Sequence, residues 1–288
     1  MSAGLQFIVL VALAPLLQGV MRSIRAKLSG RPGPSPLQPY RDLRKLWSKE
    51  ALVAQSTSPL VVATPGIVLG VALTFAALVP PAAGGAALGA SAVAMTLLLA
   101  LGRFALVLAA LDVRSGFAAM AASREMTFAA LTEGPLILAL ISGAVLSPDS
   151  PAALAAGRTP VSGILAAAAL LLVMLFETAR IPIDNQETHY ELTMIHEGLG
   201  LEYSGWELAL LQAAAFVRQA AFFVLAARLL PGTGALTVAW IGALAVAIPV
   251  VERVYAKMRL FEVPQLFASA TVLALASIGL RLAGLGAW

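Results

Sequence analysis

Long stretches of apolar residues, each about the length needed to cross a lipid bilayer, limit most strongly how this chain can fold. Of its 288 residues, 60% are hydrophobic and only 12% are charged, whereas a soluble domain carries roughly 25% charged residues. A helix of about 20 consecutive apolar residues spans the hydrocarbon core. The sequence therefore predicts an all-α integral membrane protein, a bundle of about eight transmembrane helices with cytoplasmic loops, in a single multi-span domain covering residues 1–288. The expected spans are 4–23, 59–80, 88–111, 128–147, 160–180, 207–230, 235–253 and 264–286.

The first expected span also has one feature of a cleaved signal peptide. Ala12, Leu13 and Ala14 give a small-x-small pattern of the kind found at cleavage sites. The segment lacks the basic region that precedes the apolar run in a signal peptide, and its first cation, Arg22, follows that run. A transmembrane helix is therefore the favoured interpretation of this segment.

Cationic side chains are concentrated on one side of the expected membrane. Residues 22–50 contain eight Lys or Arg residues and two acids. With eight spans, the loops at 112–127, 181–206 and 254–263 lie on the same side. Lys and Arg accumulate in cytoplasmic loops, so both termini are expected on the extracytoplasmic side. The net charge of +4 is thus explained by topology and does not indicate nucleic acid as a partner.

Titratable groups gather in one short region that follows an apolar run. The region 177–205 holds both histidines of the chain and several of its acids. Ionisable groups inside a membrane are costly, on the order of 2.5–3.5 kcal/mol each at a helix centre, so they indicate function by default. The cationic and titratable residues of the region are Glu177, Arg180, Asp184, Glu187, His189, Glu191, His196, Glu197 and Glu202.

Glu177 and Arg180 begin this region and are three residues apart, one helical turn if the span continues that far. We expect these two side chains to form the membrane entrance of a proton path. Because Pro182 limits continuation of the helix, residues 184–202 are expected to form a shaped loop. The alternative is a structural ion pair without a role in proton movement.

Four further charged residues fall in or beside expected spans. Arg103 and Arg218 lie within the third and sixth spans, where each can reach the interface or pair with a buried acid, and Glu177 is a candidate partner. Glu133 lies inside the fourth span, nine residues after Arg124. Glu133 and Arg124 are expected to form a second station for proton transfer. A packed, hydrogen-bonded carboxyl at Glu133 is the structural alternative.

The first expected cytoplasmic loop changes character along its length. Four prolines between residues 32 and 39 exclude a regular helix there. From Tyr40 onwards apolar side chains recur at helical spacing among cations, which predicts a short interfacial helix. This helix is interpreted either as a basic juxtamembrane anchor or as a surface that docks a soluble partner. The candidate docking residues are Arg41, Asp42, Arg44 and Lys45.

The absence of cysteine limits the cofactors that this chain can hold. It excludes disulfides, thiolate-held zinc, iron–sulfur clusters and a cysteine-ligated nickel–iron centre. His196-Glu197 begins like the zinc-binding HExxH motif, but Gly200 stands where the second histidine is required. His189 and His196 with nearby glutamates lack a third firm ligand. We therefore expect the chain to bind no metal and no cofactor, and any redox centres to lie in partner subunits.

The region 177–205 resembles one protein family closely. The matching residues are Glu177, Arg180, Pro182, Asp184, Glu187, Glu191-Leu192 and Glu202-Tyr203-Ser204-Gly205. The pattern resembles subunit 1 of respiratory complex I, the membrane component that forms the roof of the quinone chamber. Homologues of this component serve the group 4 membrane-bound nickel–iron hydrogenases, including formate hydrogenlyase and hydrogenase-4. Residues 33–46, Arg124 and Glu133 fit the same family, so the resemblance covers most of the chain.

Two departures place the chain nearer to the hydrogenase-4-like branch than to complex I. Complex I members usually have an acid where this chain has His189, and they lack a short insertion between Leu192 and Glu202. The resemblance implies a subunit of the prokaryotic cytoplasmic (inner) membrane, inactive alone, within a multi-subunit oxidoreductase. It implies soluble hydrogenase-like large and small subunits, an iron–sulfur subunit and antiporter-like membrane subunits as partners. The partners would carry iron–sulfur clusters and, in a hydrogenase, nickel–iron.

We accordingly expect a membrane anchor and proton-coupling subunit of a hydrogenase-like redox complex, which docks the soluble arm and links redox chemistry to ion translocation. A carboxylate in low dielectric has a raised pKa that a nearby cation lowers again, so acid–arginine pairs can take up and release protons. The expected relay residues are Glu177, Arg180, Asp184, Glu187, Glu191, Glu202, Glu133 and Arg124, with His189, His196, Glu197 and Arg103 as auxiliary residues.

Two other functions are compatible with the sequence. One is the quinone-chamber subunit of a NADH:quinone oxidoreductase, because apolar walls with a few polar groups suit a quinone, although no residue identifies a headgroup site. The other is a stand-alone secondary ion transporter, for which internal repeats and broken helices near the midplane are typical. The sequence shows no repeat, and its ionisable cluster lies at one membrane edge.

Overall fold

The regular elements of the protein are helices wherever the structure describes it. The computed structural model describes residues 3–52, 57–79, 88–145, 160–184, 194–231 and 234–283. Seven of the described helices are long and apolar enough to cross a membrane, and Val161–Glu177 forms a shorter apolar helix. The all-α membrane fold expected from the sequence is therefore confirmed, and each of the eight expected spans overlaps one of these helices.

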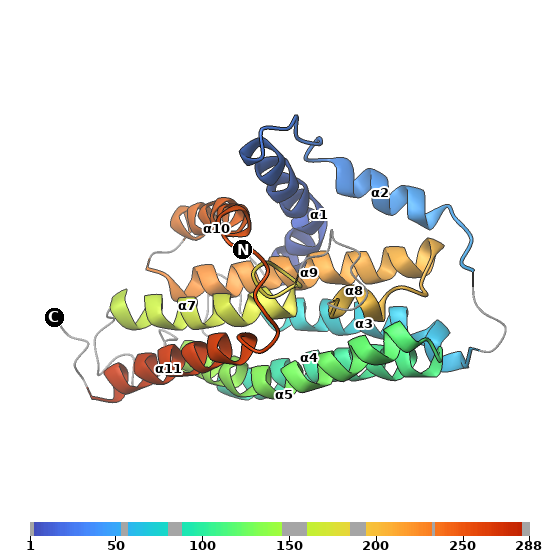
Figure 1. Ribbon diagram of the computed structural model, residues 1–288. Coiled ribbons are helices and arrows are strands. Elements are labelled where there is room, and N and C mark those ends of the chain that lie inside the picture. Colours follow the sequence, from blue (N-terminus) through green and yellow to red (C-terminus); the bar gives the residue numbers. More distant parts are fainter. Residues whose placement is uncertain are drawn as a thin grey trace.

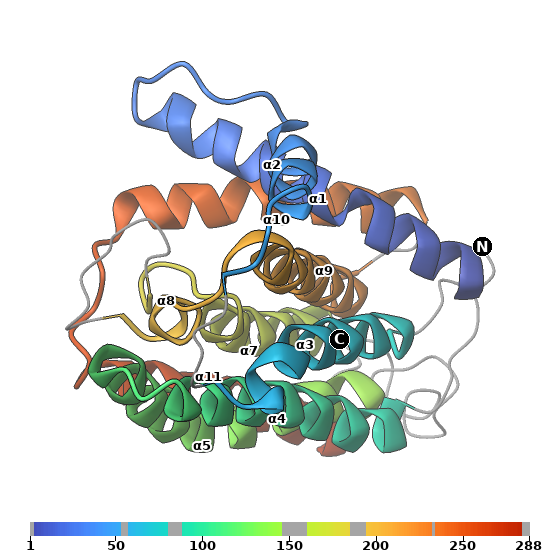
Figure 2. The ribbon, with the colours of Figure 1, turned by 90° about the vertical axis from the view of Figure 1, so that its right-hand side faces the viewer.

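Six of the described helices form the body of the bundle (Figure 1). They are α3 (Pro59–Ala77), α4 (Leu88–Asp112), α5 (Gly116–Val145), α7 (Pro160–Glu177), α9 (Gly205–Leu229) and α11 (Val263–Leu282). Helix α9 packs on α3 and α7, α4 packs on α3 and α5, and α11 packs on α5 and α7. On one side of α9, α1 (Ala3–Leu28) and α10 (Ala235–Val254) lie across the direction of the bundle, as the two views show (Figures 1 and 2).

Aromatic side chains fill the space between the central helices. The ring centroids of Phe75 on α3 and Phe222 on α9 are 5.1 Å apart. Phe176 of α7 packs against Phe267 of α11 at 5.5 Å and against Phe128 of α5 at 6.2 Å. Such pairs contribute about 0.5–1.5 kcal/mol each beyond the burial of their area. The last turn of α7, which carries Glu177, is thus held between α5 and α11.

Two short helices lie at the end of the bundle that carries the charged loops. Helix α2 (Gln38–Trp47) packs on α1 and α9 outside the bundle, and α8 (His196–Leu199) packs mainly on α5 (Figure 2). The helix predicted from Tyr40 onwards is confirmed as α2. It is tied to α1 by a hydrogen bond from the Tyr40 hydroxyl to the carbonyl of Ala12.

The loop predicted at 112–127 is wrong, because α5 already begins at Gly116. Residues 117–122 are rich in alanine, which has the highest helix propensity. The charged residues that follow are good helix formers and do not interrupt the backbone. Arg124 and Glu125 are therefore helical residues, on the same helix as Glu133.

Candidate functional site

The way in which α7 ends determines where three charged side chains point. The N–H groups of Ala179 and Arg180 donate to carbonyls of the last turn of α7 at 3.0 and 2.8 Å, the bond pattern of a Schellman C-cap. Ala179 has a φ of 52°, the left-handed position that glycine usually occupies in this cap. The N–H of Asp184 then returns to the carbonyl of Arg180 at 3.1 Å. Because the chain turns twice within a few residues, Glu177, Arg180 and Asp184 face different parts of the bundle.

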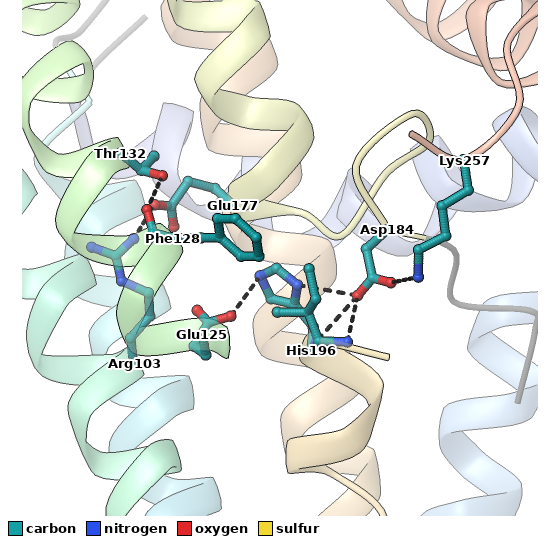
Figure 3. Close-up of polar contacts among 9 residues, drawn as sticks. Arg103, Glu125, Phe128, Thr132, Glu177, Asp184, His196 and Lys257 are labelled. Carbon is teal, nitrogen blue, oxygen red and sulfur yellow. Dashed lines mark hydrogen bonds and ion pairs between the residues drawn. The ribbon is translucent and has the colours of Figure 1, made fainter. Parts of the chain in front are cut away.

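Glu177 pairs with an arginine from another helix. Its side chain is fully buried, and Oε1 lies 2.5 Å from Nη1 of Arg103 on α4 (Figure 3). Nη2 of the same arginine lies 3.2 Å from Oε1 of Glu133 on α5. The candidate pair between Arg103 and Glu177 is therefore confirmed. Because the Glu133 side chain is 45% exposed, this first network runs from the buried end of α7 to the outer surface of α5.

Arg180 belongs to a second network on the opposite side of the bundle. Its Nη1 lies 3.0 Å from Oε1 of Glu252 on α10, and its Nη2 donates to the side-chain oxygen of Gln219 on α9 at 2.7 Å. A further hydrogen bond joins Arg180 to Gln18 of α1. Arg25 of α1 lies 3.4 Å from the other oxygen of Glu252. The network thus joins the turn after α7 to α1, α9 and α10.

The expected pair between Glu177 and Arg180 is therefore wrong. A spacing of three residues places two side chains on one face only while the helix continues. Here α7 ends at Glu177, and the C-cap directs Arg180 away from it. Proximity in the sequence gave the correct region but the wrong partner.

Asp184 is the centre of a third network, which lies around the turn after α7 and α8 and reaches α5 (Figure 3). Its Oδ1 accepts a hydrogen bond from Nζ of Lys257 at 2.8 Å, and its Oδ2 accepts from the backbone N–H groups of His196 and Ile195 at 3.0 and 3.3 Å. The ring of His196 lies between two carboxylates. Nδ1 is 3.4 Å from Oδ2 of Asp184, and Nε2 is 3.5 Å from Oε2 of Glu125 on α5. His196, expected only as an auxiliary residue, thus links the turn after α7 to α5.

Neighbouring charges set the pKa values of Asp184 and His196. Burial acts to raise the pKa of Asp184, but the hydrogen bonds and charges of His196 and Lys257 outweigh burial and hold this pKa well below its ordinary value of 3.8. Burial acts to lower the pKa of His196, but Glu125 and Asp184 outweigh burial and raise this pKa above its ordinary value of 6.5. Asp184 is therefore anionic at neutral pH, and His196 holds a proton more readily than a free imidazole.

The remaining predicted site residues take other places. Nη1 of Arg124 donates to the carbonyl of Met194 at 2.9 Å and holds the segment before α8, so Glu133 is paired with Arg103 rather than with Arg124. Glu202 is exposed, and Glu197 is partly exposed on α8. Glu187, His189 and Glu191 lie outside the described residues, and their roles stay predictions. Within the described ranges no group of three or more His, Asp or Glu side chains is arranged to hold a metal ion.

Comparison with known proteins agrees with the resemblance seen in the sequence. The sequence profile of the family described as NADH dehydrogenase matches residues 2–285. The chain belongs to the NADH dehydrogenase subunit 1 family. Hydrogenase-4 component C of Escherichia coli (strain K12) is 37% identical over 217 residues, which cover 71% of this chain and 67% of that protein. Formate hydrogenlyase subunit 4 of the same organism is 34% identical over 219 residues, covering 70% of this chain and 67% of that protein.

A solved structure shares the fold of this subunit 1 chain. It is the structure of the membrane-bound sulfane sulfur reductase, an archaeal respiratory membrane complex. One chain of that complex matches with a TM-score of 0.71 and 18% sequence identity, over 97% of this chain and 98% of that chain. At this identity the likeness concerns the fold alone. The subunit 1 chain is thus a multi-pass membrane protein whose relatives are parts of multi-subunit membrane complexes.

The sequence motif at 202–205, which belongs to the pattern of the subunit 1 family, has an architectural role in this chain. The hydroxyl of Tyr203 donates to the carbonyl of Val61 at the start of α3 (3.1 Å), and burial raises the pKa of Tyr203 to about 12. The hydroxyl of Ser204 accepts from a backbone N–H in the segment after α2 (2.8 Å). Gly205 has a φ of 53°, and a side chain there would overlap the backbone of that segment. The motif therefore joins the first loop to the beginning of α9.

The predicted docking residues lie on α2 and divide into two groups. Arg41, Arg44 and Lys45 are exposed. Asp42 pairs with Arg22 of α1 at 3.5 Å. Asp42 thus helps to hold α2 on the bundle, whereas the three cations face outward.

Several residues of the three networks were missed by sequence reasoning. Glu252 and Gln18 are polar groups within or at the end of apolar helices, and this isolation is a signal that singles them out. Glu125 directly follows Arg124, but it falls in the loop that was wrongly predicted at 112–127. Gln219 is likewise a polar group within an apolar helix, whereas for Lys257, in the connection after α10, the sequence gives no comparable signal.

Proposed function

We propose that this chain is the membrane anchor and proton-coupling subunit of a hydrogenase-like redox complex. The observation that carries the proposal is the presence of two networks of buried charged groups, one that joins Asp184, His196 and Glu125 and one that leads from Glu177 through Arg103 to Glu133 on the surface of α5. Ionisable groups inside a membrane bundle are costly and mark proton or ion pathways. The relatives named hydrogenase-4 component C and formate hydrogenlyase subunit 4 support a hydrogenase-like complex.

Electron transfer in this proposal takes place in partner subunits. The chain has no cysteine, so it offers no thiolate to an iron–sulfur cluster or a nickel–iron centre. The partners carry these centres, and this chain binds none. A change of charge on a nearby centre alters the protonation of carboxylates at the membrane edge, because neighbouring charges shift pKa values. Redox chemistry and proton movement are coupled in this way without a cofactor in this chain.

The outer face of α2 and the segment after it form the surface proposed to dock the soluble arm. Trp47 is 63% exposed and Leu52 is 78% exposed, next to the exposed cations of α2. Exposed aromatic side chains and arginines are enriched at protein interfaces. The segment is fixed to the start of α9 through Ser204 and Gly205. The occupants of this cytoplasmic surface are the hydrogenase-like large and small subunits and the iron–sulfur subunit.

A second proposed interface lies within the membrane, where the first network reaches the surface of α5. A carboxylate that faces lipid is unfavourable by roughly 2.5–3.5 kcal/mol near the centre of the bilayer. The 45% exposure of the Glu133 side chain is therefore best explained by a neighbouring membrane subunit that covers it. An antiporter-like subunit at this face would receive protons from Glu133.

Deleting the chain tests the anchoring role directly. Hydrogen evolution from reduced methyl viologen reports the catalytic arm without requiring coupling, and it is measured in membrane and soluble fractions with and without this chain. We expect the activity to move to the soluble fraction when the chain is absent, and the purified chain to show no redox activity. Activity that stays on the membrane without the chain would contradict anchoring. Proton transport by the purified chain alone in liposomes would instead indicate a stand-alone transporter.

A further inference from the structure

His196 lies between two carboxylates that differ in their surroundings (Figure 3). Both oxygens of Asp184 are occupied, one by Lys257 and the other by two backbone N–H groups and the His196 ring. Oε2 of Glu125 makes no hydrogen bond within the described part of the chain, and its ion pair with Nε2 of His196 is longer, at 3.5 Å. Asp184 is thus a fully satisfied anion, whereas Glu125 has an acceptor that faces the imidazole.

The exposure of the two partners also differs. The side chain of Glu125 is 1% exposed and that of His196 is 16% exposed. Of the two groups, the His196 side chain is thus the partly exposed one and Glu125 the buried one. On its inner side the ring packs edge-on against Phe176, with centroids 4.9 Å apart. Within the described residues, His196 is therefore placed to carry a proton between the surface and Glu125.

We propose that His196, oriented by Asp184, is the group that exchanges protons between solvent and the buried carboxylate of Glu125. This inference rests on the proposed coupling function. Asp184 accepts a hydrogen bond from Nδ1–H, and this bond directs Nε2 towards Glu125. A carboxylate fixes the histidine tautomer in the same way in other proton-transfer sites. The Nε2–H of the imidazolium passes its proton to the Glu125 carboxylate, which leaves a neutral ring and a neutral carboxylic acid. The ring then takes up one solvent proton at Nε2, so that one proton has moved inward.

The charges around this pair connect it to the first network. Arg218 on α9 interacts electrostatically with His196, Glu125 and Glu177. Neutralising Glu125 removes a negative charge from this group and so makes the electrostatic field at Glu177 and Arg103 more positive. Among the described residues, the other charged groups near His196 are Arg124 of α5, Asp184 and Lys257 from the adjoining loops, Glu197 on α8 itself and, beyond Phe176, Glu177 of α7.

The test uses His196→Gln in the assembled complex in inverted membrane vesicles. Reduced methyl viologen supplies electrons for hydrogen evolution, and the quenching of the acridine dye ACMA reports proton uptake. We expect normal assembly on a native gel, normal hydrogen evolution with the vesicles uncoupled, and proton uptake lowered by about 10²-fold or more, the low end of what a positioned proton-transfer group contributes. In the parent complex proton uptake should fall as the pH rises through the raised pKa of His196, and this limb should be absent in the variant.

A double variant separates proton exchange from a merely structural contact. If His196 and Glu125 act as a unit, His196→Gln/Glu125→Gln should lose no more proton uptake than either single variant, because groups in one pathway are not additive. Multiplicative losses, or unchanged uptake and an unchanged pH profile in assembled His196→Gln, would overturn the inference. If His196→Gln does not assemble, Glu125→Gln decides, since normal uptake in that variant overturns it equally. Glu177→Gln is measured beside these variants. If only Glu177→Gln loses proton uptake, the coupling function stands and the role of His196 is refuted. If none of the variants loses proton uptake, the coupling function itself is refuted.

Discussion

Replacing Glu177 by glutamine should separate proton coupling from assembly. The amide keeps the shape of the carboxylate and can still accept the hydrogen bond of Arg103, which is 2.5 Å long in the structure. Because Arg103 stays cationic, its bond to the amide remains a hydrogen bond to a charged group, so losing the charge of one partner should cost no more than about 1–1.5 kcal/mol. Arg103 also keeps Glu133 at 3.2 Å. The loss therefore stays below the roughly 3–5 kcal/mol of a stranded buried charge.

A cost of this size is small against a folding free energy of about 5–15 kcal/mol, so we expect normal amounts of assembled Glu177→Gln complex on a native gel. Proton-coupled turnover in membranes should fall by about 10²–10⁴-fold, because the group no longer titrates. Glu262→Gln, the same chemical change in the connection before α11, is the matched control and should behave like the parent. Assembled Glu177→Gln complex with normal turnover and pumping would refute the relay, and loss of assembly would show that the pair is structural.

Three further predictions concern the second and third networks and the topology. Arg180→Gln should lower the stability of the purified complex by about 3 kcal/mol, which is near the low end for a broken buried pair because Arg25 still faces Glu252. Lys27→Gln, at an exposed position, is the control and should leave the melting temperature unchanged. An unchanged melting temperature in Arg180→Gln would contradict an anchoring role for Arg180. Because the pKa of His196 is raised, its protonation stabilises the contact of α8 with α5 fully below pH 6.5, and this stabilisation is lost as the pH rises through the raised pKa. Because the pKa of Asp184 is lowered, the stabilisation that Asp184 contributes stays constant above pH 3.8. Hydrogen exchange of amides 194–200, corrected for the intrinsic rate, should therefore accelerate above neutral pH in the parent chain and not in His196→Gln, and equal pH dependence in both would count against this linkage. Because the chain has no native cysteine, Ser48→Cys can be labelled selectively and should react with a reagent on the cytoplasmic side. Ser204→Cys should react more slowly from the same side, because Ser204 is partly buried and hydrogen-bonded. Labelling of Ser48→Cys from the outside would reverse the predicted orientation.

The sequence was sufficient for the parts of the fold that depend on local composition. Apolar runs of span length gave helices, because a backbone in lipid must satisfy its own hydrogen bonds. The spacing of apolar residues from Tyr40 gave α2. The location of the functional region also followed from composition, since buried charges are rare enough in such a chain to stand out. Glu177 was a candidate partner for Arg103 or Arg218, because each arginine was an isolated charge in an apolar span, but the sequence did not choose between them.

The partners of Arg180 could not be predicted in this way. Their choice depends on the C-cap at Ala179, a single residue with positive φ that the sequence does not reveal, since glycine is the usual signal for this cap. It also depends on α10 lying across α1 and α9, which brings Glu252 to the turn after α7. Hydropathy determines that a segment spans the membrane, but it does not determine which helices it crosses.

The segment 177–184 places Glu177, Arg180 and Asp184 into three different networks, and this arrangement bears on how the family can be recombined. A chimera that receives only this segment from another member keeps the motif but not the side chains that complete it. Its arginine would need two glutamines and a glutamate from three other helices, and its aspartate would need a lysine from the connection after α10 and a histidine from α8. Segment 177–184 is therefore expected to function in another family member only when the residues that it contacts are transferred with it. Substitutions in this segment should accordingly be accompanied by substitutions at the positions that it contacts.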